Sequence, residues 1–261
     1  MPTEDEIRFI LNTDPTWSAY AIGDLMPDYA AYSRWSIGGG TNGKGLTLLF
    51  SRLTPSALFA MGDPEGVVLA IEGSELPKEV YLLLRREHLE VVSRYYTLPQ
   101  ANTRQMHRMV LVSETMPAET EGLPVGFKID ALSLHDADRV SNLYAQGGPY
   151  APDAFAPYQV ADGTYFGVVD AQGEVLASGG THVVDWKTGV AAIGNLYTHP
   201  QYRGRGFGQA ILRAVLHALL EGGVHLIVLN VDERNLTAKR LYERNGFRVH
   251  CPYIEGIAYR K

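Results

Sequence analysis

Glycine and arginine alternate in the stretch HPQYRGRGFGQAIL, which runs from His199 to Leu212. Glycines permit positive φ and let a ligand approach the backbone where a Cβ would block it. A helix-like apolar run follows at once, and the first N–H groups of a helix have no intrahelical partner. Together with the helix dipole, such groups form an anion site. The stretch therefore predicts a phosphate or pyrophosphate held by main-chain amides, with Arg203 and Arg205 adding positive charge.

The spacing of these glycines excludes two common nucleotide loops. G-x-G-x-G differs from the dinucleotide fingerprint G-x-G-x-x-G, and no acidic residue follows at the interval of a Rossmann unit. The Gly-Lys-Ser/Thr ending of a Walker A loop occurs nowhere in the chain. The glycine run at residues 38–45 also lacks it, which favours a hairpin loop there. Read as R-x-x-G-x-G, Arg203, Gly206 and Gly208 fit a different pattern.

A second group of chemically capable residues lies in NVDERNLTAKRLYERNGFRVH, residues 230–250. Asn235 and Tyr242 are seven residues apart, about 20° from a whole number of helical turns. They therefore share one face of a helix, with Lys239 between them. A tyrosine hydroxyl ordinarily stays protonated at neutral pH and can donate a proton to a departing thiolate. The alternative is that Tyr242 only packs in the core.

Together the two segments, residues 193–250, resemble the GNAT superfamily of acyl-CoA-dependent N-acyltransferases. The first resembles that family's pyrophosphate motif, a strand leading into R-x-x-G-x-G and a helix. The second resembles its other CoA-contacting motif, an Asn, a helix, a Tyr and the sequence NGF. One such motif alone is a weak signal, whereas both in order within an α/β frame are a strong one.

The resemblance implies acetyl-CoA as the co-substrate and assigns residues to it. The strand before the loop is implied to splay from its neighbour, so that the backbone of Leu196, Tyr197 and Thr198 pairs with the pantetheine arm. The N–H of Leu196 is then the donor that polarises the thioester carbonyl, and Tyr242 is the general acid. The pyrophosphate is implied to bind the amides of Arg203, Gly204, Arg205, Gly206, Phe207, Gly208 and Gln209. The cofactor-binding residues implied on the second helix are Asn235, Lys239 and Tyr242.

A general base is the weak point of this resemblance. Many family members use a glutamate on the strand before the pantetheine contacts, whereas GVAAIGNLYTHP contains no acidic residue. His182 and Asp185 on the preceding predicted strand are alternatives, as are Tyr150 and Tyr158 in the loop after a predicted helix. For each of them a surface or packing role is the competing interpretation, since single titratable residues are weak evidence of a site.

The second half of the chain supplies the elements that position these residues. Apolar periodicity and turn residues predict helices over residues 135–147, 209–223 and 235–246. They predict strands over residues 127–133, 164–169, 175–185, 190–200, 225–231, 247–253 and 254–261. The order is β-α-β-β-β-α-β-α-β-β, which indicates a mixed α/β domain over residues 126–261. The resemblance implies that this domain has the acyl-CoA N-acyltransferase fold.

The first half lacks R-x-x-G-x-G but also alternates helices and strands. We predict helices over residues 4–12 and 76–96, and strands over residues 46–53, 56–62, 66–73 and 107–113. The polar stretch at 113–127 is the best boundary, which makes residues 1–120 a separate domain. This domain is compatible with a degenerate second copy of the fold that lost CoA binding. Trp17, Tyr20 and Trp35 would then face the acceptor, unless they are core aromatics.

Composition excludes several classes of protein. The 261 residues carry a formal net charge of −6, which argues against a nucleic-acid partner. The single cysteine, Cys251, allows neither an intramolecular disulfide nor a multi-thiolate metal site, and no metal is expected. The N-terminus lacks a signal pattern and no apolar run approaches membrane-spanning length. We therefore expect a cytoplasmic protein without a membrane partner.

These observations predict an N-acetyltransferase that moves an acetyl group from acetyl-CoA to a primary amine. Direct attack is expected, because no Ser/His/Asp or Cys/His constellation is evident. The alternative, supported by the missing acidic residue, is a non-catalytic acyl-CoA-binding sensor or regulatory module. A fold that serves only protein interaction is a third reading. The acceptor, a small molecule or a peptide amine, is not identified, and a homodimer stays open.

Overall fold

The computed structural model of the chain describes residues 2–112, 122–152 and 155–261. Contacts divide the chain into two compact units. Unit 1 comprises Met1–Arg108 with Val249–Lys261, and unit 2 comprises Met109–Arg248. Most of the predicted boundary at 113–127 lies outside the described residues.

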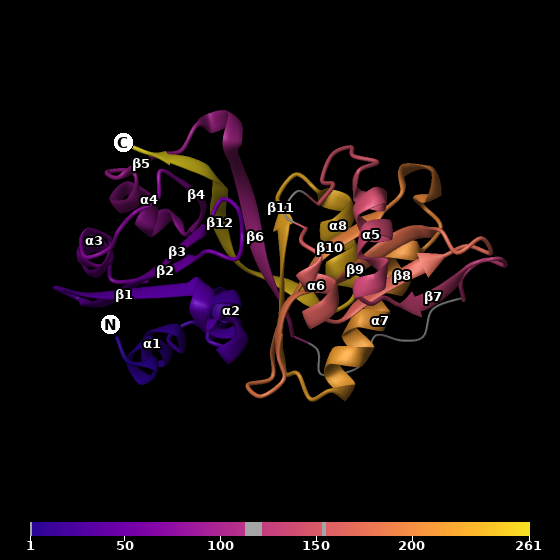
Figure 1. Cartoon of the computed structure of the whole chain (residues 1–261), viewed down its shortest axis with the longest axis horizontal. Helices are drawn as coiled ribbons and strands as arrows, with labels where there is room; N and C mark the ends of the chain where they lie inside the picture. The colour runs from indigo at the N-terminus through magenta and orange to yellow at the C-terminus, as the bar shows by residue number, and fades with distance from the viewer. Residues whose placement is uncertain (1, 113–121, 153–154) are drawn as a thin grey trace. The chain divides into compact units, whose positions relative to one another are not determined.

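Unit 1 is a sheet with helices packed on it (Figure 1). Its strand order is β1-β2-β3-β4-β12-β6, and β5 pairs with β12. Its helices are α1 (Glu4–Leu11), α2 (Pro15–Gly23), α3 (Pro64–Glu72) and α4 (Arg86–Val92), with short 3-10 turns at Pro27–Tyr32 and Gln100–Asn102. Its strands are β1 (Ser33–Gly40), β2 (Gly43–Phe50), β3 (Ala57–Gly62), β4 (Glu79–Leu84), β5 (Tyr96–Thr97), β6 (Thr103–Leu111) and β12 (Phe247–Arg260).

Two predicted elements of unit 1 are wrong. Residues 66–73, predicted as a strand, belong to helix α3, because Asp63 caps its first turn and Pro64 occupies the first helical position. Residues 76–96, predicted as one helix, form strand β4 and then helix α4. In β4 every second side chain is buried, namely Val80, Leu82 and Leu84, which is the period of a strand.

The C-terminal strand also departs from the prediction. The two strands predicted over 247–261 are one strand, β12, and most of it belongs to unit 1 rather than to a domain of residues 126–261. Residues 254–259 pair antiparallel with β4, and Figure 1 shows this yellow strand beside β4. A strand's own pattern indicates which face is buried, but not which distant strand it pairs with.

Unit 2 is the mixed α/β domain that the sequence predicts. Its helices are α5 (Ala137–Tyr144), α6 (Tyr158–Asp162), α7 (Phe207–Glu221) and α8 (Leu236–Arg244), with 3-10 turns at Leu134–Asp136 and Pro200–Tyr202. Its strands are β7 (Lys128–Ala131), β8 (Tyr165–Val169), β9 (Val175–Asp185), β10 (Val190–Thr198) and β11 (Leu226–Asp232). They lie in the order β11-β10-β9-β8-β7. The apolar face of α7 fills the core with Ile211, Leu212, Val215, Leu216 and Leu219.

The two units repeat one order of elements. Unit 1 runs α1-α2-β1-β2-β3-α3-β4-α4, and unit 2 runs α5-α6-β8-β9-β10-α7-β11-α8. In each unit the crossover helix joins two parallel neighbours, β3 to β4 and β10 to β11. The three strands before it are antiparallel in both. This repetition supports a tandem arrangement of one fold. The predicted order of elements in the first half did not show it, because residues 66–73 and 76–96 were assigned to the wrong kind of element.

Trp17 and Cys251 both lie in the interior of unit 1. Trp17 has no exposed surface, and its ring packs on Phe59 and Tyr253 at centroid distances of 5.4 and 5.3 Å. It is therefore a core residue and not an acceptor contact. The Cys251 thiol is buried, and burial raises its pKa.

A partly exposed cluster of charged side chains around Asp14 connects three segments of unit 1. The Asp14 carboxylate accepts from the N–H of Trp17 at 3.0 Å. It also lies 2.7 Å from Arg85 Nη2 and 2.9 Å from His250 Nε2. Burial opposes ionisation of Asp14, but the Trp17 N–H and the charges of His250 and Arg85 outweigh it and lower the pKa of the carboxyl.

This cluster predicts acid sensitivity of unit 1. Because the pKa of Asp14 is lower in the folded chain than its ordinary 3.8, the folded state binds fewer protons and its stability rises with pH. The contribution is complete above pH 3.8 and is lost as the pH falls through the folded pKa. The thermal unfolding temperatures of the wild type and of Asp14→Asn should differ at pH 7, and the difference should shrink as the pH falls below 3.8. A constant difference across this range would contradict the ion pairing.

Candidate active site

Strand β10 separates from β11 halfway along its length. The two pair in parallel only from Val190 to Ile193, opposite Leu226 to Leu229. Beyond Ile193, β10 keeps β9 as its partner among the described residues, and its register shifts between Gly194 and Tyr197. Asn195, in this irregular segment, has a φ of 55°. The splay that the resemblance implied is therefore present beside Leu196.

The loop after β10 presents a row of backbone donors. The six consecutive N–H groups from Gly204 to Gln209 donate no hydrogen bond to any acceptor in the described parts of the chain. Gly206, the N-cap of α7, supplies no capping side chain. Gly204 and Gly206 have φ values of 78° and 82°, and no described atom lies within 4 Å of where their Cβ would be. This open helix N-terminus has the features of an anion site.

The side chains of two arginines in this loop contact neighbouring aromatic rings. The Arg203 guanidinium lies over the Tyr197 ring at 5.6 Å, and its Nε donates to the Thr198 carbonyl at 3.2 Å. The Arg205 guanidinium lies over the Tyr202 ring at 5.0 Å. The backbone N–H of Arg203 reaches the Pro200 carbonyl at 3.5 Å. The row of unpaired amides therefore begins at Gly204.

The corresponding helix of unit 1 has a closed N-terminus. The Asp63 carboxylate caps α3 by accepting from the N–H of Gly66 at 3.1 Å. The β1–β2 hairpin lies directly on this turn, because a Cβ on Gly66 would overlap the backbone nitrogen of Gly45. A carboxylate and a packed hairpin leave no room for a phosphate at α3, whereas α7 is open and uncapped.

Three predicted site segments converge at Gly208. A Cβ on Gly208 would lie 3.6 Å from Leu241 Cδ2 of α8 and 3.8 Å from Thr198 Oγ1 of β10. Both distances are ordinary van der Waals contacts, so the protein itself leaves room for a methyl group here. The end of β10, the start of α7 and the middle of α8 thus meet at one place.

The side chains of three other predicted site residues, Phe207, Tyr197 and Gln209, are buried or bonded to other side chains or backbone. Phe207 is buried, with its ring 5.0 Å from Phe127, and Tyr197 is buried, with its hydroxyl donating to the Gly147 carbonyl at 2.7 Å. The side-chain amide of Gln209 bonds that of Asn245 at 2.8 Å. At these positions only the backbone is available to a ligand.

Helix α8 carries the three other predicted residues. Asn235 is its N-cap, and its Oδ1 accepts from the N–H of Ala238 at 3.1 Å. Lys239 is half-buried. Tyr242 is 7% exposed and packs on Phe247 at a centroid distance of 6.0 Å. The assignment of Tyr242 as general acid therefore stays a prediction.

A buried polar network beside the irregular segment of β10 was missed at the level of sequence. The Tyr144 hydroxyl donates to the Asn195 carbonyl at 2.8 Å and accepts from Ser178 Oγ at 2.9 Å. Asn195 Nδ2 donates to Gln159 Oε1 at 2.9 Å and to the Tyr165 hydroxyl at 2.8 Å. Burial raises the pKa of Tyr144 well above its ordinary value, so its hydroxyl stays a donor. In the sequence Tyr144 only continues the apolar face of a helix.

The same network selects the tautomer of a neutral His182 ring. Gln159 Oε1 accepts from the backbone N–H of Ala156 at 3.1 Å and from Asn195 at 2.9 Å. The Gln159 NH₂ group is therefore the partner of His182 Nδ1, at 3.0 Å. A neutral His182 ring must then carry its proton on Nε2. A base that accepts a proton at Nε2 needs the other tautomer, so Gln159 opposes that role.

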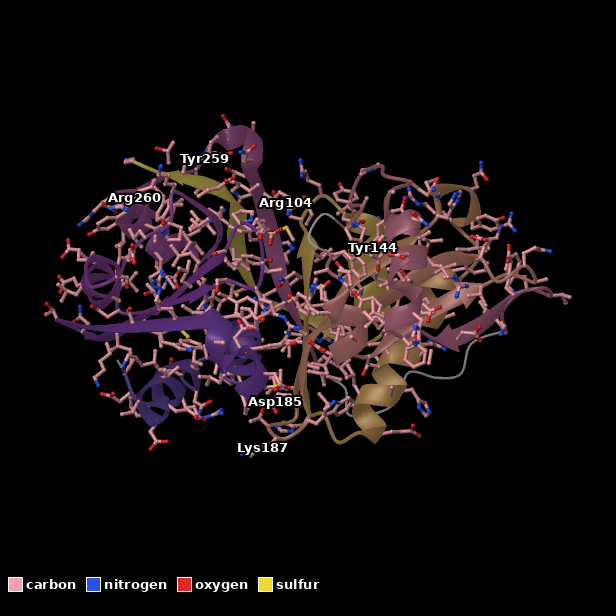
Figure 2. The ribbon with its side chains drawn as sticks, viewed as in Figure 1. Arg104, Tyr144, Asp185, Lys187, Tyr259 and Arg260 are labelled. Atoms are coloured by element: carbon pink, nitrogen blue, oxygen red, sulfur yellow. The ribbon has the colours of Figure 1, made fainter. Side chains whose placement is uncertain are left out.

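The other candidate bases are placed no better. Asp185 accepts from the backbone N–H groups of Lys187 and Thr188 at 3.0 and 3.2 Å and from the Thr188 hydroxyl at 2.6 Å. It closes the β9–β10 turn, and Figure 2 shows Asp185 and Lys187 well away from Tyr144. Tyr150 is exposed, and Tyr158 begins α6.

Asp185→Ala should therefore lower stability without lowering the rate of the chemical step. Loss of bonds to one buried carboxylate costs about 1–3 kcal/mol. We expect a lower Tm, by several degrees, and an unchanged kcat. A large fall in kcat at unchanged Tm would instead restore Asp185 as a base.

Comparisons with known proteins bear on this site. The model described as the acetyltransferase (GNAT) family matches residues 133–247. Residues 133–247, which make up most of unit 2, are a domain of the GNAT family. The matched range runs from α5 to α8. It includes the predicted CoA-binding residues on β10, on the loop after it and on α8. Among the described residues, no cluster of three or more His, Cys, Asp or Glu side chains is arranged to hold a metal ion. No helix there is long and apolar enough to cross a membrane.

Two curated relatives are named mycothiol acetyltransferase. The protein from Arthrobacter sp. (strain FB24) is 37% identical over 82 residues, 30% of this chain and 25% of that protein. The one from Paenarthrobacter aurescens (strain TC1) is 28% identical over 165 residues, 55% of this chain and 49% of that protein. The chain thus spans about half the length of these relatives or less.

A solved structure of this GNAT type extends the likeness in fold to most of the chain. A GCN5-related N-acetyltransferase from Kribbella flavida is 18% identical, with a TM-score of 0.64. The alignment covers 94% of this chain and 94% of that one. The likeness therefore includes the fold of unit 1 as well as that of unit 2.

Proposed function

We propose that this chain is an acyl-CoA-dependent N-acetyltransferase that moves an acetyl group from acetyl-CoA to a primary amine. One observation carries the proposal. The six unpaired amides from Gly204 to Gln209 lie at the uncapped start of α7, directly after the splayed end of β10. A pyrophosphate on these amides directs the pantetheine arm along the free edge of β10. The match of residues 133–247 to the GNAT family model supports this reading.

The reaction proceeds by direct attack. The amine nitrogen attacks the thioester carbon. The carbonyl oxygen becomes an oxyanion that accepts a hydrogen bond from the N–H of Leu196. The C–S bond then breaks, and the CoA thiolate takes a proton from the Tyr242 hydroxyl, which solvent restores. The amine's own proton passes to water, since His182 and Asp185 are both engaged in other bonds. The products are the amide and CoA.

We further propose that unit 1 is a copy of the same fold that has lost its CoA site. The closed N-terminus of α3, with Asp63 as cap and Gly45 packed on Gly66, supports this. A single CoA molecule per chain is therefore expected.

The acceptor is an amine whose class is still open. The name mycothiol acetyltransferase belongs to relatives that this chain matches over half their length or less. Amino acids, polyamines, aminoglycosides and peptide amines therefore all belong in an acceptor panel. A homodimer stays a prediction.

Calorimetric titration with acetyl-CoA, followed by product analysis over that panel, tests the proposal. We expect binding with a stoichiometry of one and an acetylated amine with at least one acceptor class. Absence of acetyl-CoA binding would contradict the proposal.

A non-catalytic sensor of acyl-CoA is the second candidate. It is favoured by the lack of an acidic residue on β10 and by the tautomer that Gln159 imposes on His182. Tight binding of acetyl-CoA with no product from any acceptor would support this candidate over the enzyme.

A further inference from the structure

The backbone of Asn195 is held in a conformation that asparagine seldom adopts in a strand. Its φ of 55° lies in the left-handed region, at the register shift of β10. Such a residue persists only where its surroundings over-determine it, and such residues cluster at functional sites. The contacts that hold Asn195 therefore indicate what its conformation is for.

Both ends of Asn195 are held. Its side chain donates to Gln159 and Tyr165, as described above. Its carbonyl accepts from the Tyr144 hydroxyl at 2.8 Å. A carbonyl only accepts, so the single Tyr144 proton points at it, and the Ser178 hydroxyl must be the donor in the 2.9 Å bond to Tyr144. Tyr144 and Ser178 are 6% and 0% exposed, which shields this chain of bonds from water.

The carbonyl of Asn195 and the N–H of Leu196 belong to one peptide group. In a trans peptide these two bonds point in opposite directions. By holding the carbonyl, Tyr144 therefore also determines where the N–H of Leu196 points. A hydrogen bond to the carbonyl also polarises the peptide and strengthens its N–H as a donor.

The direction of the Leu196 N–H matters because Leu196 lies where β10 separates from β11. Pairing of β10 with β11 ends at Ile193, so Leu196 lies in the part of β10 that has lost that neighbour. The first four residues of β10 are buried, whereas the next three, Gly194, Asn195 and Leu196, are partly exposed. This is where a thioester carbonyl would meet the backbone if the pyrophosphate lies on α7.

We infer that Tyr144 is a positioning residue for acyl transfer, which aims and strengthens the N–H of Leu196 by donating to the carbonyl of Asn195. The inference rests on the proposed function. Tyr144 touches neither substrate nor cofactor in this role. It acts through the peptide group between Asn195 and Leu196. Ser178 holds the Tyr144 hydroxyl by a hydrogen bond. Gln159 and Tyr165 hold the side chain of Asn195.

Tyr144→Phe removes only the hydroxyl. The ring contacts with Phe155 and Tyr197, at 5.1 and 5.8 Å, remain available to phenylalanine. Loss of an oxyanion donor typically costs 10²–10³ in kcat. Because the donor here is misaligned and not deleted, we expect kcat to fall about 10- to 100-fold. The affinity for CoA should hardly change, since the amides of α7 are untouched.

An infrared measurement separates this role from simple packing. Acetyl-CoA labelled with ¹³C at its carbonyl, bound to the full-length wild type, should show a carbonyl stretch at lower frequency than in water. In Tyr144→Phe the frequency should return towards the value in water. Ser178→Ala keeps the Tyr144 hydroxyl, and it is the second variant if Tyr144→Phe fails to fold. It should give a smaller shift of the same sign.

Tyr96→Phe is the matched control. Tyr96 is 1% exposed and its hydroxyl donates to the Pro77 carbonyl at 2.9 Å, so the same kind of bond is lost in unit 1. It should leave kcat and the carbonyl frequency unchanged. Wild-type kcat and frequency in Tyr144→Phe would overturn the inference, as would a fall in kcat without a frequency shift. If the wild type does not bind acetyl-CoA, the proposed function fails first and the inference fails with it.

Discussion

Gly206→Glu should abolish the binding of CoA to unit 2. Gly206 precedes the first turn of α7, where no side chain caps the helix and no described atom lies within 4 Å of a Cβ. A glutamate there places a negative charge among the amides that would hold the pyrophosphate. Loss of two charge-assisted hydrogen bonds, each worth about 1.5–3 kcal/mol, weakens binding at least about 100-fold. Titration calorimetry with CoA measures this directly.

Two control variants separate charge from backbone strain. Gly206→Gln fills the same space without charge and should bind CoA more tightly than Gly206→Glu. Gly223→Glu places the same side chain at the other end of α7, at a φ of 83° and in similarly open surroundings. It carries a similar backbone cost and should keep the wild-type affinity. Unchanged CoA affinity in Gly206→Glu would contradict the placement of the site on α7.

Tyr242→Phe should lower kcat while leaving CoA binding nearly intact. General acid catalysis by a positioned side chain contributes about 10²–10⁴ in rate. A fall of about 100-fold in kcat is therefore expected if Tyr242 protonates the departing thiolate. Phenylalanine keeps the apolar contact with Phe247, so the core of unit 2 should be preserved. Steady-state kinetics with the best acceptor, together with CoA affinity and Tm, measure the effect.

Tyr259→Phe provides the background for this measurement. Tyr259 is an exposed tyrosine on β12 of unit 1, visible in Figure 2 near the end of the chain. Its loss of a hydroxyl should change neither kcat nor Tm. If Tyr242→Phe keeps the full turnover of the wild type, Tyr242 has only a packing role and another group protonates CoA.

The open start of α7, where we propose the anion site, depends on features that are local in the chain, so it can be predicted from the sequence. Gly204 and Gly206 adopt positive φ, which glycine does without steric cost. The apolar run after them makes α7 helical and leaves its first N–H groups unpaired. None of this requires contact with a distant residue. The mixed α/β class followed from periodicity in the same way.

Elements whose identity depends on distant partners could not be predicted. Residues 66–73 are apolar and β-branched enough to suggest a strand, yet they form part of α3, where glycines of β1 and β2 allow the helix to lie directly on the hairpin. The sequence of strand β4 resembles the start of a helix, but in the structure it pairs with β3 and β12. Local propensity for strand is weak and yields to such packing.

The sequence by itself determined the open, glycine-flanked start of α7, because glycine conformation and helix start are properties of adjacent residues. Only the tertiary structure decided which side chains hold the irregular backbone of β10 beside it. Tyr144, Ser178, Gln159 and Asn195 come from separate elements and meet through hydrogen bonds of 2.8 to 2.9 Å. Such bonds depend on how α5, α6, β9 and β10 pack together, and no spacing along the chain encodes that packing.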